Sequence, residues 1–204
     1  MSEENIIIEI LERTEHVDKI ASILVNKINE FNLLNHYLYK NILKIAEQIL
    51  NVSGLDINQK FSGVEYSPLH LSIQENGEKA FDKILNYPNL NINSVTISNQ
   101  TALFRALDYY ERNKRNKHFF DSLINKIDVN IINLQNETIL HRLAKYNDFN
   151  LIKRVLETTD INVYIKNNNN LTALELAYDL KVCYPNRSFN KTIEYLEDYN
   201  NKKR

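Results

Sequence analysis

The chain repeats one short phrase four times, and no other feature of its sequence constrains the fold as strongly. Each copy starts with Ser or Thr and carries Leu two residues later. The copies start at Ser67, Thr101, Thr138 and Thr172, so their spacings are 34, 37 and 34 residues. Similarity at one such period is typical of stacked repeats, in which each unit buries its apolar side against the next. The first expectation is therefore a solenoid and not a compact enzyme core.

A second phrase, Asp or Asn followed by Ile or Val and then Asn, recurs about ten residues upstream of the first. Its copies start at Asp56, Asn91, Asp128 and Asp160. Apolar residues at i, i+3 and i+4 spacing lie between each first phrase and the next second phrase, which predicts an amphipathic helix there. Each unit is therefore expected to form a helix, a turn, a second helix and another turn.

With these two phrases in phase, the chain resembles the ankyrin-repeat family, whose unit begins its first helix with T-P-L-H-x-A. The resemblance covers residues 40–199, and Ser67-Pro68-Leu69-His70 matches the family phrase best. It implies an all-α ankyrin-repeat solenoid of about five helix-turn-helix repeats with a helical N-terminal cap. We expect the cap at 1–36, the solenoid at 37–199 and a polar tail at 200–204. We interpret a helix near 37–51 as the second helix of a degenerate first repeat.

Individual residues of the phrases have predictable roles. The leading Ser or Thr can cap the first helix, and Pro68 suits its first position, where a missing N–H has no cost. In the resembling family the histidine at His70 and His141 forms hydrogen bonds within and between repeats. The family usually places Gly between the two helices, but this chain has only 3 Gly. Asn147 or Asp148 is expected to replace Gly in one such turn, because Asn tolerates left-handed backbone.

The overall composition favours no charged partner. The formal net charge is −1, so nothing attracts the whole chain to nucleic acid or to an anionic membrane. Cys183 is the single cysteine, which fits a reducing compartment, and no apolar run approaches a membrane span. We expect a soluble, monomeric, cytoplasmic protein, in the host cytosol if it is a secreted effector or a viral protein.

The sequence holds no recognisable catalytic motif. It has no phosphate-binding Gly-rich loop, no nucleophile elbow and no pair of His or Cys at metal-ligand spacing, so we expect no enzyme activity, no cofactor and no metal. An enzyme with an unrecognised site, built around His118 and Cys183 with nearby carboxylates, stays open as an alternative.

The resemblance implies binding of a partner protein through the concave face of the solenoid. The family's variable contact positions fall on first helices and on the turns before them. In this sequence they are Tyr66, Gln74, Glu75, Gln100, Asp108, Tyr109, Glu137, Lys145, Tyr146, Leu171 and Asp179. Tyrosine is enriched in binding hot spots, so a row of Tyr66, Tyr109 and Tyr146 is the preferred contact stripe.

Two further hypotheses concern the partner. The basic run 112–118 lies in an enlarged connection between helices, Tyr109–His118, and offers an alternative function as a nucleic-acid or anionic-ligand binder through Lys114, Arg115 and Lys117. A second enlarged connection is expected at Val182–Ser188. The excess of Asn, Ile, Lys and Tyr is typical of an AT-rich genome, which suggests a host-interacting effector of an intracellular bacterium or a large DNA virus.

Overall fold

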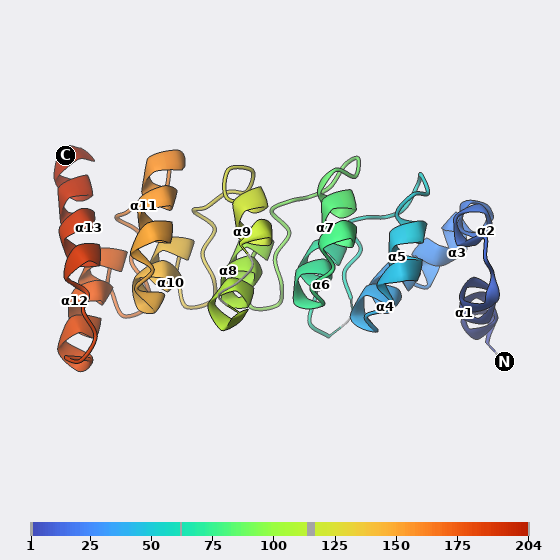
Figure 1. Ribbon diagram of the computed structural model, residues 1–204, viewed down its shortest axis with the longest axis horizontal. Helices are drawn as coiled ribbons and strands as arrows, with labels where there is room; N and C mark the ends of the chain where they lie inside the picture. Colours follow the sequence, from blue (N-terminus) through green and yellow to red (C-terminus); the bar gives the residue numbers. More distant parts are fainter. Residues whose placement is uncertain (1, 62, 114–116, 204) are drawn as a thin grey trace. The chain divides into compact units, whose positions relative to one another are not determined.

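The computed structural model describes residues 2–61, 63–113 and 117–203, and these residues form thirteen helices and no strand (Figure 1). The chain divides into two compact units. The first unit comprises Met1–Ile97 and Asn116–Phe119, and the second comprises Ser98–Arg115 and Phe120–Arg204. The expected all-α helical-repeat fold is confirmed.

The first unit holds three N-terminal helices and two helix pairs. The three N-terminal helices are α1 (Glu3–Arg13), α2 (Val17–Ile23) and α3 (Val25–Glu30). The pairs are α4 (Leu33–Tyr39) with α5 (Leu43–Ile49), and α6 (Pro68–Gln74) with α7 (Glu78–Leu85). First helices pack on first helices and second helices on second helices, since α4 contacts α6 and α5 contacts α7.

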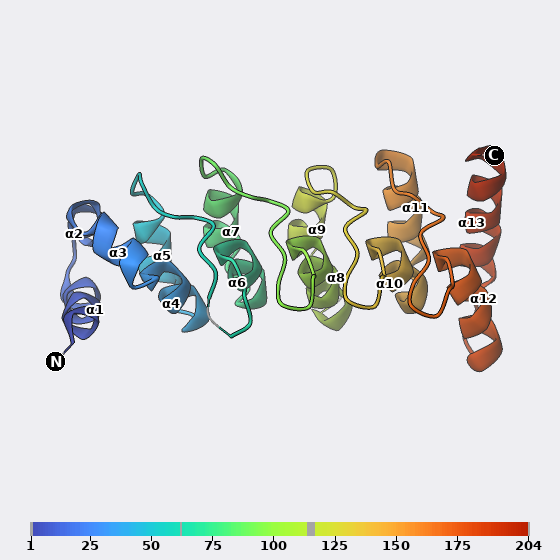
Figure 2. The same ribbon diagram turned by 180° about the vertical axis from the view of Figure 1, so that it is seen from behind.

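The second unit repeats this arrangement. It holds α8 (Ala102–Asn113), then α10 (Ile139–Tyr146) with α11 (Phe149–Thr158), then α12 (Ala173–Cys183) with α13 (Asn190–Lys203). Helix α9 (His118–Leu123) starts in the first unit and ends in the second. Within the second unit α10 contacts both α8 and α12, and α11 contacts α13. Hairpin-like loops join each second helix to the next first helix (Figure 2).

The expected single helix near 37–51 is wrong, because two helices, α4 and α5, share this segment. Asn41 adopts left-handed backbone with φ of 56°, which ends α4. The Ile42 N–H then donates to the carbonyl of Tyr37 at 2.9 Å, and this bond closes the end of the helix. The α4–α5 pair therefore has both helices of a repeat, and only α1–α3 precede it.

Asparagine takes the left-handed position between the two helices of three repeats. Asn41, Asn76 and Asn147 have φ of 56°, 54° and 59°. The prediction for Asn147 is confirmed, whereas Gly77 does not supply the positive φ that a family glycine would. Gly77 instead allows close packing, since an added Cβ would lie 2.9 Å from Leu43 Cδ2.

The core includes apolar residues of the two phrases together with those of the second helices and the N-terminal helices. Leu69, Leu103 and Leu140 are buried as expected, while Leu174 of the last repeat is half-buried. The small residues that follow them are buried between helices; they are Ser72, Ala106, Ala144 and Ala177. Their size lets neighbouring helices approach closely.

The segments expected as an enlarged connection and as a tail are partly helical. Helix α8 continues to Asn113 and α12 to Cys183, so much of the added length extends the first helix. Residues 200–203, expected in a polar tail, continue α13. Lys202 and Lys203 lie in the last turn, where the helix dipole favours positive charge.

Candidate interaction surface

The predicted contact residues of the first unit lie around α6. Tyr66 precedes the helix and is half-buried, with its ring stacked on His70 at a centroid distance of 5.9 Å. Its backbone pairs with Phe61, whose N–H donates to the Tyr66 carbonyl at 2.7 Å. Gln74 is exposed at the end of α6 and donates to Glu75, which is half-buried. Tyr66 therefore belongs to a turn and not to a helix face.

The second unit joins three predicted contact residues in one cluster between α8 and α10. The Tyr146 hydroxyl donates to Asp108 Oδ1 at 2.8 Å, and Arg142 Nη2 donates to the same oxygen at 2.7 Å. Glu137 Oε2 lies 3.9 Å from Arg142 Nη1 and accepts from Asn133 Nδ2 at 3.2 Å. We call Asp108, Glu137, Arg142 and Tyr146 the polar cluster.

Partial burial sets the electrostatics of the polar cluster. The side chains of Asp108 and Arg142 are 14% and 19% exposed, so their attraction is only weakly screened. Burial alone would lower the pKa of Arg142, but the hydrogen bond and charge of Asp108 outweigh it and raise this pKa. Burial and the Asp108 carboxylate also raise the pKa of Tyr146. At neutral pH Arg142 is therefore a cation and Tyr146 a neutral phenol, and both are held by hydrogen bonds to Asp108.

Arg142 is the member of the polar cluster that sequence reasoning missed. It lies four residues after Thr138, and Arg105 has the same place after Thr101. Burial lowers the pKa of Arg105, opposed in part by Asp108. A comparison of equivalent positions in successive phrases would have found both arginines, because cations at half-buried helix positions need carboxylate partners.

The remaining predicted residues of the second unit differ in exposure. Lys145 on α10 and Asp179 on α12 are exposed and each lies seven residues after the Thr of its phrase. Tyr109 and Tyr146 are half-buried, each eight residues after that Thr. Gln100 and Leu171 are half-buried in the turns before α8 and α12. Tyr109 and Tyr146 are thus equivalent positions, whereas Tyr66 is not.

His141 has the structural role that the resemblance implies. Its Nδ1 accepts from the Thr138 N–H at 3.1 Å and lies 2.9 Å from the Thr138 hydroxyl. Because Nδ1 accepts, Nε2 carries the proton and donates to the Leu171 carbonyl of the next repeat at 3.1 Å. His70 Nδ1 likewise bonds the Ser67 hydroxyl, at 2.8 Å. The predicted bonds within a repeat are confirmed for both histidines, and the bond between repeats for His141.

The alternatives for catalysis and anion binding gain little from the structure. Cys183 is exposed, and His118 Nε2 contacts Asp82 Oδ1 at 2.8 Å. No group of three or more His, Cys, Asp or Glu in residues 2–61, 63–113 and 117–203 could hold a metal ion. Of the basic run, Lys114, Arg115 and Asn116 lie outside the described residues. Helices in the described part of the chain are all too short or too polar to cross a membrane.

Comparison with known families agrees with the repeat architecture. Residues 123–177 match the family model for ankyrin repeats in many copies. This match covers the end of α9, the α10–α11 pair and the start of α12, together with the turns that join them. No curated protein matches the chain. Ankyrin repeats are generally protein–protein interaction modules. Residues 123–177 are thus similar to ankyrin repeats, and the helix pairs outside this match repeat the same helix-turn-helix arrangement.

Proposed function

We propose that the chain is a non-catalytic module that binds a partner protein through the first-helix face of its second unit. We define this face by Asp108 and Tyr109 of α8, Arg142, Lys145 and Tyr146 of α10, and Asp179 of α12. All of them except Arg142 are positions that the family resemblance predicts on a concave contact surface. The proposal extends the general role of ankyrin repeats to a defined set of side chains.

The polar cluster is the observation that carries this proposal. Its hydrogen bonds fix Tyr146 and Arg142 in one arrangement before any partner arrives, and the Arg142 guanidinium lies 5.7 Å from the centre of the Tyr146 ring. A side chain that is already ordered loses little entropy on binding. Tyr and Arg are also the residues most enriched in interface hot spots.

Exposed charges beside the polar cluster would select the partner. Lys145 and Asp179 extend from neighbouring first helices and make no ion pair in the described part of the chain. A partner with opposite charges in matching positions would bind faster and more specifically than one without them. The hypothesis that this partner is a host protein rests on the composition alone.

A capture experiment with two matched double variants tests the proposal. Lys145→Glu combined with Asp179→Lys reverses both charges of the first-helix face and conserves the net charge. Lys153→Glu combined with Glu157→Lys makes the same exchange on α11, a second helix outside this face. Each purified protein is used to capture partners from a parent-cell lysate and from a candidate host lysate, and bound proteins are identified by mass spectrometry.

The expected result is a partner that the wild-type chain and the α11 variant retain but the first-helix variant loses. Circular dichroism and thermal unfolding should match for all three proteins, since the exchanged residues are exposed. Equal retention by both variants would contradict the proposed face. The lysate that yields the partner decides between a host protein and a parent-cell protein.

A further inference from the structure

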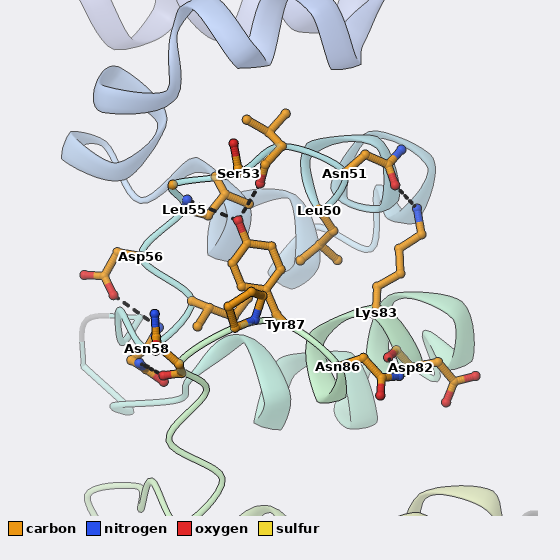
Figure 3. Close-up of a pocket in the computed structure, with 15 residues that line it drawn as sticks. Leu50, Asn51, Ser53, Leu55, Asp56, Asn58, Asp82, Lys83, Asn86 and Tyr87 are labelled. Carbon is orange, nitrogen blue, oxygen red and sulfur yellow. Dashed lines mark hydrogen bonds between the residues drawn. The ribbon is translucent and has the colours of Figure 1, made fainter.

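A pocket of about 770 Å³ opens in the first unit between the turn after α5 and the end of α7 (Figure 3). Residues 50–58 form one side, and Asp82, Lys83 and residues 86–89 form the other. Its volume falls within the range of ligand sites in proteins. None of the predicted contact residues lines it. The pocket is therefore separate from the first-helix face.

The size of the pocket follows from its turn. The equivalent hollow in the second unit, between residues 124–130 and 158–160, has a volume of only about 270 Å³. In the first unit five residues separate Leu50 from Asp56, whereas three separate Ile124 from Asp128. The added turn contains Gly54, whose φ of 85° suits glycine. The longer turn after α5 thus widens a hollow that is also present, at smaller size, in the second unit.

Hydrogen bonds hold the walls of the pocket in place. The Tyr87 hydroxyl donates to the Val52 carbonyl and accepts from the Leu55 N–H, so its ring stands at the centre of the pocket (Figure 3). Asn29 of α3 donates to the Gly54 carbonyl at 2.9 Å. The turn is therefore fixed both from α7 and from α3, and a ligand would not have to order it.

The charges around the pocket favour a cation. Lys83 Nζ is already bound, since it donates to the Glu47 carbonyl and to Asn51 Oδ1, both at 2.6 Å. Asp56 is an exposed carboxylate on the rim, whereas Asp82 Oδ1 on the other side already contacts His118 Nε2. Among the lining residues Lys83 is the one cation, so Asp56 is the carboxylate left for a bound cation. The carboxyl ends of α5 and α7, whose dipoles attract positive charge, also lie here.

The polar and ring groups of the pocket suit a guanidinium better than an ammonium. The Tyr87 ring provides a flat aromatic surface on which a planar cation can stack. Among the described residues, Asn51 bonds Lys83 through Oδ1 and Asn86 bonds Asp82 through Nδ2, so Asn51 Nδ2 and Asn86 Oδ1 are a donor and an acceptor for a peptide backbone. We propose that the pocket binds an arginine side chain in an extended segment of a partner protein, with the guanidinium against Tyr87 and paired with Asp56.

The test uses N-acetyl-arginine methylamide as the probe and follows backbone amide shifts of the full chain by nuclear magnetic resonance. A probe of this size should bind with Kd of about a millimolar or somewhat below. The citrulline analogue has the same shape without the charge. Agmatine has the guanidinium without the peptide groups.

Asp56→Asn is the informative variant, because Asn91 already occupies the equivalent place in the next phrase, so the turn accepts Asn. Asp128→Asn makes the same change at the smaller hollow and is the matched control. We expect shifts confined to residues 50–58 and 82–89, at least tenfold weaker binding of the citrulline analogue, and a similar loss in Asp56→Asn but not in Asp128→Asn.

Other outcomes would overturn the proposal. Shifts that are absent, or that lie outside the pocket, would show that it is not an arginine site. If the citrulline analogue bound as tightly as the arginine probe, the positive charge would not be what the pocket recognises. Binding of agmatine as tight as that of the peptide probe would assign the pocket to a free guanidinium compound and exclude the partner segment. None of these results bears on the first-helix face, so the two proposals fail independently.

Discussion

Asn58 and Asn91 join two successive repeats through a side chain that acts as donor and acceptor at once. Asn58 Oδ1 accepts from the Asn91 N–H at 2.7 Å, and its Nδ2 donates to the Asn89 carbonyl at 2.8 Å. Asn130 makes the same pair of bonds in the second unit, to Asn162 and Asp160. The Asn that ends the second phrase thus links one repeat to the next.

Replacing Asn130 by Ala should lower the free energy of unfolding by about 1–2 kcal/mol, because two hydrogen bonds between repeats are lost. Asn162→Ala is the control, since in the described residues Asn162 Oδ1 bonds only Tyr164 of its own turn. Urea unfolding of both variants gives the comparison. Equal losses would mean that the phrase stabilises its own turn and not the stack.

Glu65→Asn should stabilise the chain by about 0.5–1 kcal/mol, because left-handed backbone disfavours Glu more than Asn. Glu65 has φ of 54°, at a place where Asn99, Asn136 and Asn170 stand in the later repeats. Glu65→Gln is the control that removes the exposed ion pair with Lys60 and keeps the strained backbone. Thermal unfolding measures the stability of both variants. If Glu65→Gln stabilised the chain as much as Glu65→Asn, relief of backbone strain would not be the cause.

The repeat architecture was predictable because its signals are local. Ser67-Pro68 starts a helix, and Leu69 enters the core in the way that the phrase indicates. The break at Asn41 was missed, because a left-handed Asn at a helix end resembles an ordinary polar residue in a helix. Arg142 was missed for another reason: its partner Asp108 lies 34 residues away, and only the stacking of repeats brings them together.

His141 should make stability depend on pH. Burial lowers its pKa in the folded chain below the ordinary value of 6.5. Between that lowered pKa and about 6.5 the unfolded chain binds more protons, so the free energy of unfolding falls as the pH drops through this window and is retained above it. Imidazole resonances should report the pKa, and His141→Gln should flatten the pH dependence of urea unfolding. A pKa of His141 above 6.5 would contradict this account.

The polar cluster should show energetic coupling between Asp108 and Tyr146. Tyr146→Phe removes the hydrogen bond to Asp108 and a longer one from Arg142, and should cost about 1 kcal/mol. Asp108→Asn removes the charge that compensates Arg142 and should cost about 2–3 kcal/mol. The double variant should be more stable than the sum of the single losses predicts, by about 1 kcal/mol. Strict additivity in urea unfolding would show that the hydroxyl and the carboxylate do not act together.

Amide hydrogen exchange of the chain with and without its captured partner tests the proposed binding face most directly. Partner binding slows exchange where it covers the chain or stabilises it locally. We expect the largest added protection in α8, α10 and α12 and in the turns before them, with little change in α11 and α13. Protection concentrated in α11 and α13, with α10 and α12 unchanged, would contradict it.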